Sequence, residues 1–179
     1  GMLEMCHALG STVLLACSTV SPHSTHDFSL IKEDLQKLAM LAVPLNIRIA
    51  YEALSWGRHV NLFPQSWEIV AEADRANLGL CLDSFHILAH GTELDLLEDI
   101  DAHKIFLVQL SDFLWQEVRS AEERIETTRR FTKELLVAGE PIAVDEFVAR
   151  VLGRAHHAAC AHAAPDEARV ILGLAHLFA

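Results

Sequence analysis

The chain has 179 residues, 51% of them hydrophobic, which is enough for one domain with a substantial buried core. Its 14 lysines and arginines stand against 25 aspartates and glutamates, and the resulting net charge of −11 argues against a nucleic-acid or anionic-membrane partner. Every apolar run is shorter than the roughly 18 residues of a membrane span, and no basic stretch precedes the first one, so we expect a soluble cytoplasmic protein.

The cysteines agree with a cytoplasmic location. They lie far apart in the sequence and form no Cys-x-x-Cys pair: Cys6, Cys17, Cys81 and Cys160. Two of them fall inside apolar runs that are typical of strands. We therefore expect free, buried thiols in a reducing compartment.

Apolar and amphipathic segments alternate along the first part of the chain. Apolar runs of strand length are followed by turn-rich stretches and then by segments with apolar residues at helical spacing. The expected strands cover residues 12–18, 46–52, 78–83 and 104–110, and the expected helices between them cover residues 30–42, 65–75 and 92–100. Strands that alternate with helices in this way predict parallel βαβ units with right-handed crossovers.

The character of the chain changes after Trp115. A charged segment with strong helix propensity covers residues 116–136, and the sequence beyond Gly153 is rich in alanine and histidine. The HHAACAH stretch at residues 156–162 lacks a second ligand pair at a zinc-site spacing, so an ordinary helix is the favoured interpretation. We expect a four-stranded region over residues 1–115 and a helical region over residues 116–179. The helical region packs on the four-stranded region or on a partner chain.

Three polar residues end three successive strand-like runs. Glu52, Asp83 and Gln109 close the strings IRIAYE, LGLCLD and KIFLVQ, at intervals of 31 and 26 residues. A barrel of eight βα units uses roughly 30 residues per unit and places its chemistry at the C-terminal ends of the strands. The sequence therefore predicts an α/β fold, a partial (βα) barrel with about four parallel strands.

An all-oxygen cluster of this kind indicates a metal site. Two carboxylates and a carboxamide suit a hard, six-coordinate cation such as Mg²⁺ or Mn²⁺ better than zinc. Such a cation polarises a substrate carbonyl and stabilises an enolate oxygen. The alternative is that polar residues at strand ends face solvent or cap the following helices.

Other residues near these strand ends are candidates for substrate contact. His86 follows Asp83 by three residues and can act as a base or as a hydrogen-bond donor to substrate. Arg58 and His59 lie in the loop after the second strand and can contact an anionic or hydroxylated substrate. Asp112 follows the fourth strand and can orient a metal ligand. Solvated loop residues are the alternative for this group.

The segment from residue 9 to 115 resembles the middle of a xylose-isomerase-like TIM barrel, the sugar phosphate isomerase/epimerase superfamily. The strings IAYEALSWGRHVN, NLGLCLDSFHILA and KIFLVQLSD are most similar to bacterial 3-dehydroshikimate dehydratases. In that family the strand-end Glu, Asp and Gln bind a divalent metal together with a Glu from the last strand, and the His of the DSFH motif lies in the active site. The resemblance thus implies Glu52, Asp83 and Gln109 as ligands of Mg²⁺, Mn²⁺ or Co²⁺, and His86 as a catalytic residue.

The resemblance also implies a reaction. The dehydratases convert 3-dehydroshikimate to protocatechuate by proton abstraction next to a ketone, formation of an enolate and loss of water, so we expect a small polyhydroxylated or carboxylated substrate. One alternative is a sugar or sugar phosphate isomerase or epimerase of the same superfamily. A second is a non-catalytic, dimerising remnant, because the matched segment corresponds to strands four to seven of the eight and lacks the fourth ligand.

Four parallel strands leave two unpaired edges and an uncovered inner face. Either the C-terminal helices fold over the sheet, or two chains associate so that their half-barrels complete one another. A third possibility is a shifted reading frame whose tail has lost its ancestral structure. We expect a homodimer.

Overall fold

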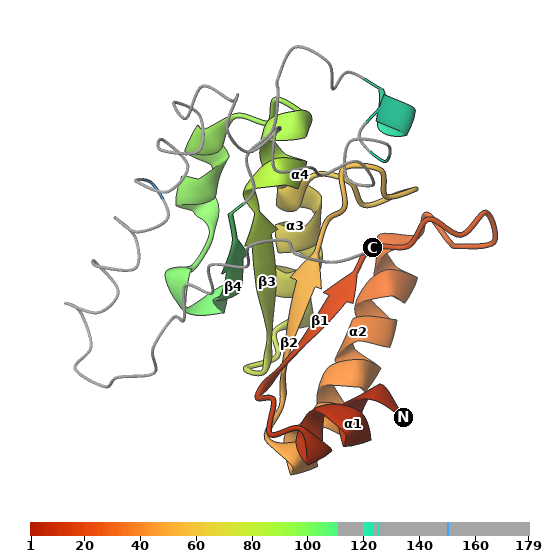
Figure 1. Ribbon diagram of the computed structural model, residues 1–179, viewed down its shortest axis with the longest axis vertical. Helices are drawn as coiled ribbons and strands as arrows, with labels where there is room; N and C mark the ends of the chain where they lie inside the picture. Colours follow the sequence, from red (N-terminus) through yellow and green to blue (C-terminus); the bar gives the residue numbers. More distant parts are fainter. Residues whose placement is uncertain (111–119, 124, 126–149, 151–179) are drawn as a thin grey trace.

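The computed structural model describes residues 1–110, 120–123, 125 and 150. Four parallel strands form one sheet in the order β1-β2-β3-β4 (Figure 1). They are β1 (Val13–Cys17), β2 (Arg48–Glu52), β3 (Leu78–Asp83) and β4 (Ile105–Gln109). The four predicted strands and their parallel arrangement are confirmed. The predicted helical region after residue 115 lies almost wholly outside the described residues, as does the HHAACAH stretch.

Within residues 1–110, one α-helix precedes the first strand, and three α-helices and three short 3-10 helices lie between the strands. The α-helices are α1 (Met2–Ala8), α2 (Phe28–Ala42), α3 (Phe63–Ala73) and α4 (Ser84–Ala89), and the 3-10 helices are η1 (Val43–Leu45), η2 (Leu94–Asp99) and η3 (Ala102–Lys104). The predicted helix over residues 92–100 is thus a 3-10 helix. Helices α1 and α4 were not among the predicted elements.

Helix α2 begins and ends where local chemistry requires. The Asp27 side chain accepts a hydrogen bond of 2.9 Å from the backbone N–H of Ser29, which satisfies one of the free donors of the first turn. Pro44 follows the last turn and has no N–H with which to continue the helix. The helix is therefore held to the length that spans one face of the sheet.

The sheet has two different faces. Helices α2 and α3 pack side by side on one face, where Ile49, Leu80 and Leu82 are buried (Figure 1). Ala50 and Cys81 belong to a separate, smaller cluster. Side chains alternate along a strand, so Glu52 and Asp83, two positions beyond Ala50 and Cys81, lie on the same face as this smaller cluster. That face is the inner one of a barrel.

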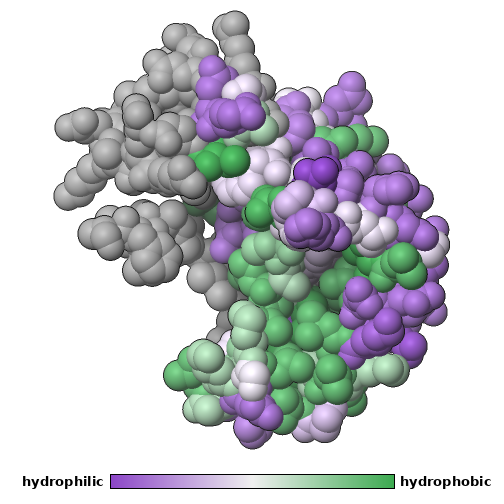
Figure 2. Space-filling model, turned by 90° about the vertical axis from the view of Figure 1, so that its right-hand side faces the viewer, coloured by the Kyte–Doolittle hydropathy of each residue, from purple (hydrophilic) through white to green (hydrophobic). Residues whose placement is uncertain are grey.

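The edge of the sheet formed by β1 adjoins an apolar surface. Figure 2 shows hydrophobic side chains gathered over the lower part of this side of the molecule. Several large hydrophobic residues are exposed there. Met2, Met5 and Leu9 lie on or just after α1, and Met40, Leu41 and Val43 lie at or just after the end of α2. Among the residues that the structure describes, no helix is long and apolar enough to cross a membrane.

Candidate metal centre

The register of the sheet brings the strand-end residues to one rim. Cys17 pairs with Glu52 across β1 and β2, and Glu52 pairs with Cys81 across β2 and β3. After a register irregularity in β3, Asp83 pairs with Gln109 of β4. Because the strands are parallel, these C-terminal ends lie side by side, as in an enzyme barrel.

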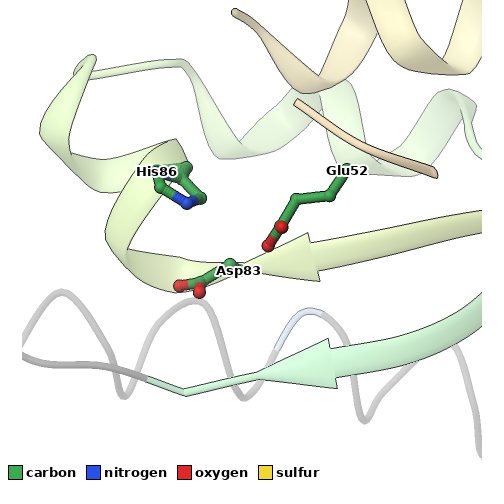
Figure 3. Close-up of side chains that lie close together, drawn as sticks. All are labelled: Glu52, Asp83 and His86. Atoms are coloured by element: carbon green, nitrogen blue, oxygen red, sulfur yellow. The ribbon is translucent and has the colours of Figure 1, made fainter. Parts of the chain in front are cut away.

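The side chains of Glu52, Asp83 and Gln109 converge. The Gln109 amide lies between the two carboxylates, with one of its two polar atoms 3.0 Å from Glu52 Oε1 and 3.1 Å from Asp83 Oδ2. The candidate ligand atoms of Glu52, Asp83 and His86 all lie within 4.8 Å of one another (Figure 3). The structure thus brings together the residues that the strand-end pattern selected.

This donor set fits a divalent cation in one orientation of the amide. With its nitrogen inward, Gln109 donates to both carboxylates; with its oxygen inward, three oxygens face one another without a proton between them. Neighbouring ligands of an octahedral cation with bonds of about 2.1 Å are separated by about 3 Å, which is the spacing found here. Rotation of one amide therefore converts a hydrogen-bonded cluster into a ligand set for Mg²⁺ or Mn²⁺.

The electrostatics of the rim favour a positive charge. Burial raises the pKa of the Glu52 carboxyl, an effect that the thiols of Cys17 and Cys81 partly oppose. Burial, and then the Glu52 carboxylate, raise the pKa of Asp83 to about 7, against the backbone N–H of Phe85, which lowers it. Within the described part of the chain, no lysine or arginine forms an ion pair with either carboxylate. A bound cation would offset the cost of holding two buried, ionised carboxylates close together.

Asp83 also shapes the backbone beside the cluster. Its Oδ1 accepts a hydrogen bond of 2.7 Å from the N–H of Phe85 and so caps α4. Its other oxygen, Oδ2, faces Gln109. The capped turn places His86, on the first turn of α4, above the strand ends (Figure 3).

The hydrogen bonding of His86 limits what its ring can do. The ring is buried, and its Nδ1 accepts a hydrogen bond of 3.2 Å from the backbone N–H of Ser55. A backbone N–H only donates, so the neutral imidazole carries its proton on Nε2. His86 therefore suits hydrogen-bond donation better than metal ligation, for which Nε2 would have to lose that proton.

The loop after β2 is attached to α4 at both ends of the helix. Besides the contact with His86, the carbonyl oxygen of Ser55 lies 2.9 Å from Nε2 of His90. The Trp56 ring meets the His86 ring edge to face, with 4.8 Å between centroids. These contacts hold the His86 ring in a defined orientation, a feature that neither spacing nor composition indicates.

Two of the remaining predicted site residues, Arg58 and His59, make other contacts, and the third lies outside the described residues. Arg58 is exposed, and its backbone N–H donates to the carbonyl of Thr19. His59 Nε2 lies 3.2 Å from the carbonyl oxygen of Ser24, in the loop after β1. Among described residues, neither side chain makes a hydrogen bond or ion pair with Glu52 or Asp83. Asp112 lies outside the described residues.

Two thiols belong to the site although the sequence analysis assigned them no role there. Cys17 Sγ donates to Glu52 Oε2 at 3.0 Å, and Cys81 Sγ lies 3.7 Å from Glu52 Oε1. Neither thiol forms a disulfide, and Cys81 is buried as expected. Cys17 is exposed, contrary to the expectation of burial, because β1 is the edge strand of the described sheet. Although Cys17 is exposed as a residue, its thiol is partly buried where it meets Glu52. This burial, and then the Glu52 carboxylate, raise the pKa of Cys17 to about 12, so the thiol keeps its proton. The available signal was position: Cys17 ends its apolar run as Glu52 does.

Comparison with curated proteins gives relatives of two activities. A 3-dehydroshikimate dehydratase of Pseudomonas aeruginosa is 42% identical over 109 residues, a match that covers 61% of this chain and 17% of that protein. An inosose isomerase of Bacillus subtilis is 34% identical over 121 residues, covering 63% of this chain and 42% of the isomerase. The chain thus spans less than half the length of either relative.

Solved structures share the fold. A xylose isomerase-like TIM barrel/4-hydroxyphenylpyruvate dioxygenase fusion protein superposes with a TM-score of 0.72 at 31% identity, over 86% of this chain and 24% of that one. The IOLI protein with a bound zinc atom superposes with a TM-score of 0.58 at 24% identity, over 88% of this chain and 67% of that one. The model of the xylose isomerase-like TIM barrel family matches residues 1–147, and the chain therefore belongs to that family.

Proposed function

We propose that Glu52, Asp83 and Gln109 bind a divalent metal, and that the chain carries this part of a lyase site resembling that of 3-dehydroshikimate dehydratase. The observation that carries the proposal is the convergence of the Gln109 amide and the two carboxylates at about 3 Å. The 42% identity to the Pseudomonas aeruginosa dehydratase supports the reaction, although the match covers 17% of that enzyme.

The residues of the rim suit stabilisation of an enolate, the species that forms when a base removes a proton next to a ketone and from which a hydroxyl group then leaves as water. A divalent cation bound there would supply Lewis-acid polarisation of the substrate carbonyl. His86 would donate its Nε2 proton in a hydrogen bond to a substrate oxygen, with the ring held by Ser55. Arg58 and His59, in the loop after β2, would contact the carboxylate or hydroxyl groups of the substrate.

An isomerase is the second candidate function. The inosose isomerase of Bacillus subtilis matches a segment of similar length at 34% identity, and isomerisation next to a ketone begins with the same proton removal. The higher identity to the dehydratase favours the lyase. A non-catalytic, dimerising remnant is the third candidate.

One assay separates the three functions. The purified chain is incubated with Mn²⁺, Mg²⁺ or Co²⁺ and 3-dehydroshikimate, and protocatechuate is followed by its absorbance; inosose is tested in parallel. We expect metal-dependent protocatechuate formation that is lost in Asp83→Asn and retained in Asp74→Asn, which changes an exposed carboxylate in the loop before β3, at the opposite end of the strands. Turnover of inosose alone would favour the isomerase. Metal binding without turnover of 3-dehydroshikimate or inosose would favour the non-catalytic remnant.

A further inference from the structure

We infer that Cys17 is a positioning residue of the metal site: its thiol holds one oxygen of Glu52 so that the other faces Asp83 and Gln109. This inference rests on the proposed metal site and adds a residue from a fourth strand to it. It concerns how the Glu52 carboxylate is oriented, and not the reaction that follows.

The two oxygens of Glu52 have different neighbours. Oε2 accepts the hydrogen bond of 3.0 Å from Cys17 Sγ. Oε1 lies 3.0 Å from the Gln109 amide. Because Oε2 is engaged on the β1 side, Oε1 is the oxygen directed toward the neighbouring ligands. The carboxylate would therefore bind a cation through Oε1 alone.

The sheet register makes Cys17 a direct neighbour of Glu52. Cys17 and Glu52 are directly paired on adjacent parallel strands, and both side chains project from the inner face. The pair is further fixed by the backbone, since the N–H of Ser18 donates to the carbonyl of Glu52 at 2.8 Å. The other thiol, Cys81, is 3.7 Å from Oε1 and holds the carboxylate more weakly.

A group that orients a metal ligand commonly changes metal affinity by about 10-fold to 100-fold when it is removed. Cys17→Ala deletes the donor and frees Glu52 to rotate. Cys17→Ser replaces the thiol with a hydroxyl that also donates. We therefore expect Cys17→Ala to bind metal about 10-fold or more weakly, and Cys17→Ser to bind within a few-fold of the original chain.

Titration calorimetry with Mn²⁺ and absorption spectroscopy with Co²⁺ test the inference without any substrate. Cys6→Ala is the matched control, because Cys6 lies on α1 away from the rim, and circular dichroism checks that each variant is folded. We expect the original chain and Cys6→Ala to bind alike, Cys17→Ala to bind more weakly, Cys17→Ser to restore affinity, and the Co²⁺ spectrum to lack a thiolate-to-cobalt charge-transfer band.

Two results would overturn the inference while leaving the metal site intact. Equal affinity of Cys17→Ala and the original chain would show that the thiol does not orient Glu52. A thiolate-to-cobalt band that disappears in both Cys17→Ala and Cys17→Ser would make Cys17 a direct ligand instead. Absence of metal binding in the original chain would overturn the inference together with the proposed function, whereas intact binding without turnover would affect the proposed function alone.

Discussion

Asp83 caps a helix with one oxygen and faces the metal site with the other, and a single substitution separates these roles. Asp83→Asn keeps a side-chain carbonyl for the N–H of Phe85 but removes one of the two charges of the cluster. We expect Mn²⁺ affinity to fall by at least about 100-fold, because a charged ligand is lost. Calorimetry measures this, and unchanged affinity would remove Asp83 from the ligand set.

The same substitution tests the electrostatics of the metal-free chain. The pKa of Asp83 is about 7 in the folded chain, mainly because of burial, against roughly 3.9 when unfolded. Between these values the folded state binds the proton more tightly, so the free energy of unfolding increases as pH falls from about 7 to about 4; Glu52 acts in the same direction. We expect Asp83→Asn to weaken this pH dependence and to stabilise the metal-free chain by about 1–2 kcal/mol at a pH near 8.

Urea unfolding with a chelator present, at several pH values, measures this effect. Bound metal reverses the sign of this pH dependence of stability, because the metal ligands must be deprotonated. Metal affinity should therefore fall as pH drops through about 7. A metal-free chain whose stability increases from pH 4 to pH 7 in step with Asp83 ionisation would contradict the raised pKa.

His86 should affect turnover more than metal binding. Its Nδ1 accepts a hydrogen bond from the backbone N–H of Ser55, so the proton of the neutral ring is on Nε2. We expect His86→Ala to lower kcat by about 100-fold or more and to change metal affinity by no more than a few-fold. His7→Ala is the control, because His7 is exposed on α1 and precedes the sheet. Loss of metal binding in His86→Ala but not in His7→Ala would identify His86 as a ligand.

At the scale of elements, the strands and the site rim were predictable, and the short helices were not. Apolar runs ending in Glu52, Asp83 and Gln109 mark buried parallel strands, because only a sheet covered on both faces needs continuous apolar sequence. Helix α4 has six residues and depends on the Asp83 cap, and six residues are too few for a helical repeat to stand out. The contact between Cys17 and Glu52 depends on register, which one sequence does not specify.

Gly79 is an element-scale requirement that the structure explains. A Cβ at this position would lie 2.4 Å from the carbonyl oxygen of Lys104 and 2.8 Å from the Phe106 ring, between β3 and β4. We expect Gly79→Ala to lower the free energy of unfolding by about 3 kcal/mol, because backbone must move to make room. The strand displacement should also separate Gln109 from Asp83 and weaken metal binding. Urea unfolding and calorimetry measure both effects, and a fully stable variant would contradict the close approach.

For the whole molecule, we still predict the homodimer. The β1 edge is unpaired among the described strands and adjoins the exposed apolar side chains of α1 and of the end of α2 (Figure 2). A continuous apolar surface of this kind favours association, and obligate interfaces commonly bury more than about 2,000 Å². Light scattering coupled to size exclusion tests this: a monodisperse 19.9 kDa species at low micromolar concentration would refute the dimer.

The central claim is that one cation binds between the ends of β2, β3 and β4. A crystal of the chain grown with Mn²⁺ tests it most directly, because anomalous scattering locates manganese independently of the protein coordinates. We predict a single strong anomalous peak about 2.1–2.2 Å from Glu52 Oε1, Asp83 Oδ2 and the Gln109 side-chain oxygen. A peak elsewhere, or no peak at this rim with Mn²⁺ in excess, would contradict the account.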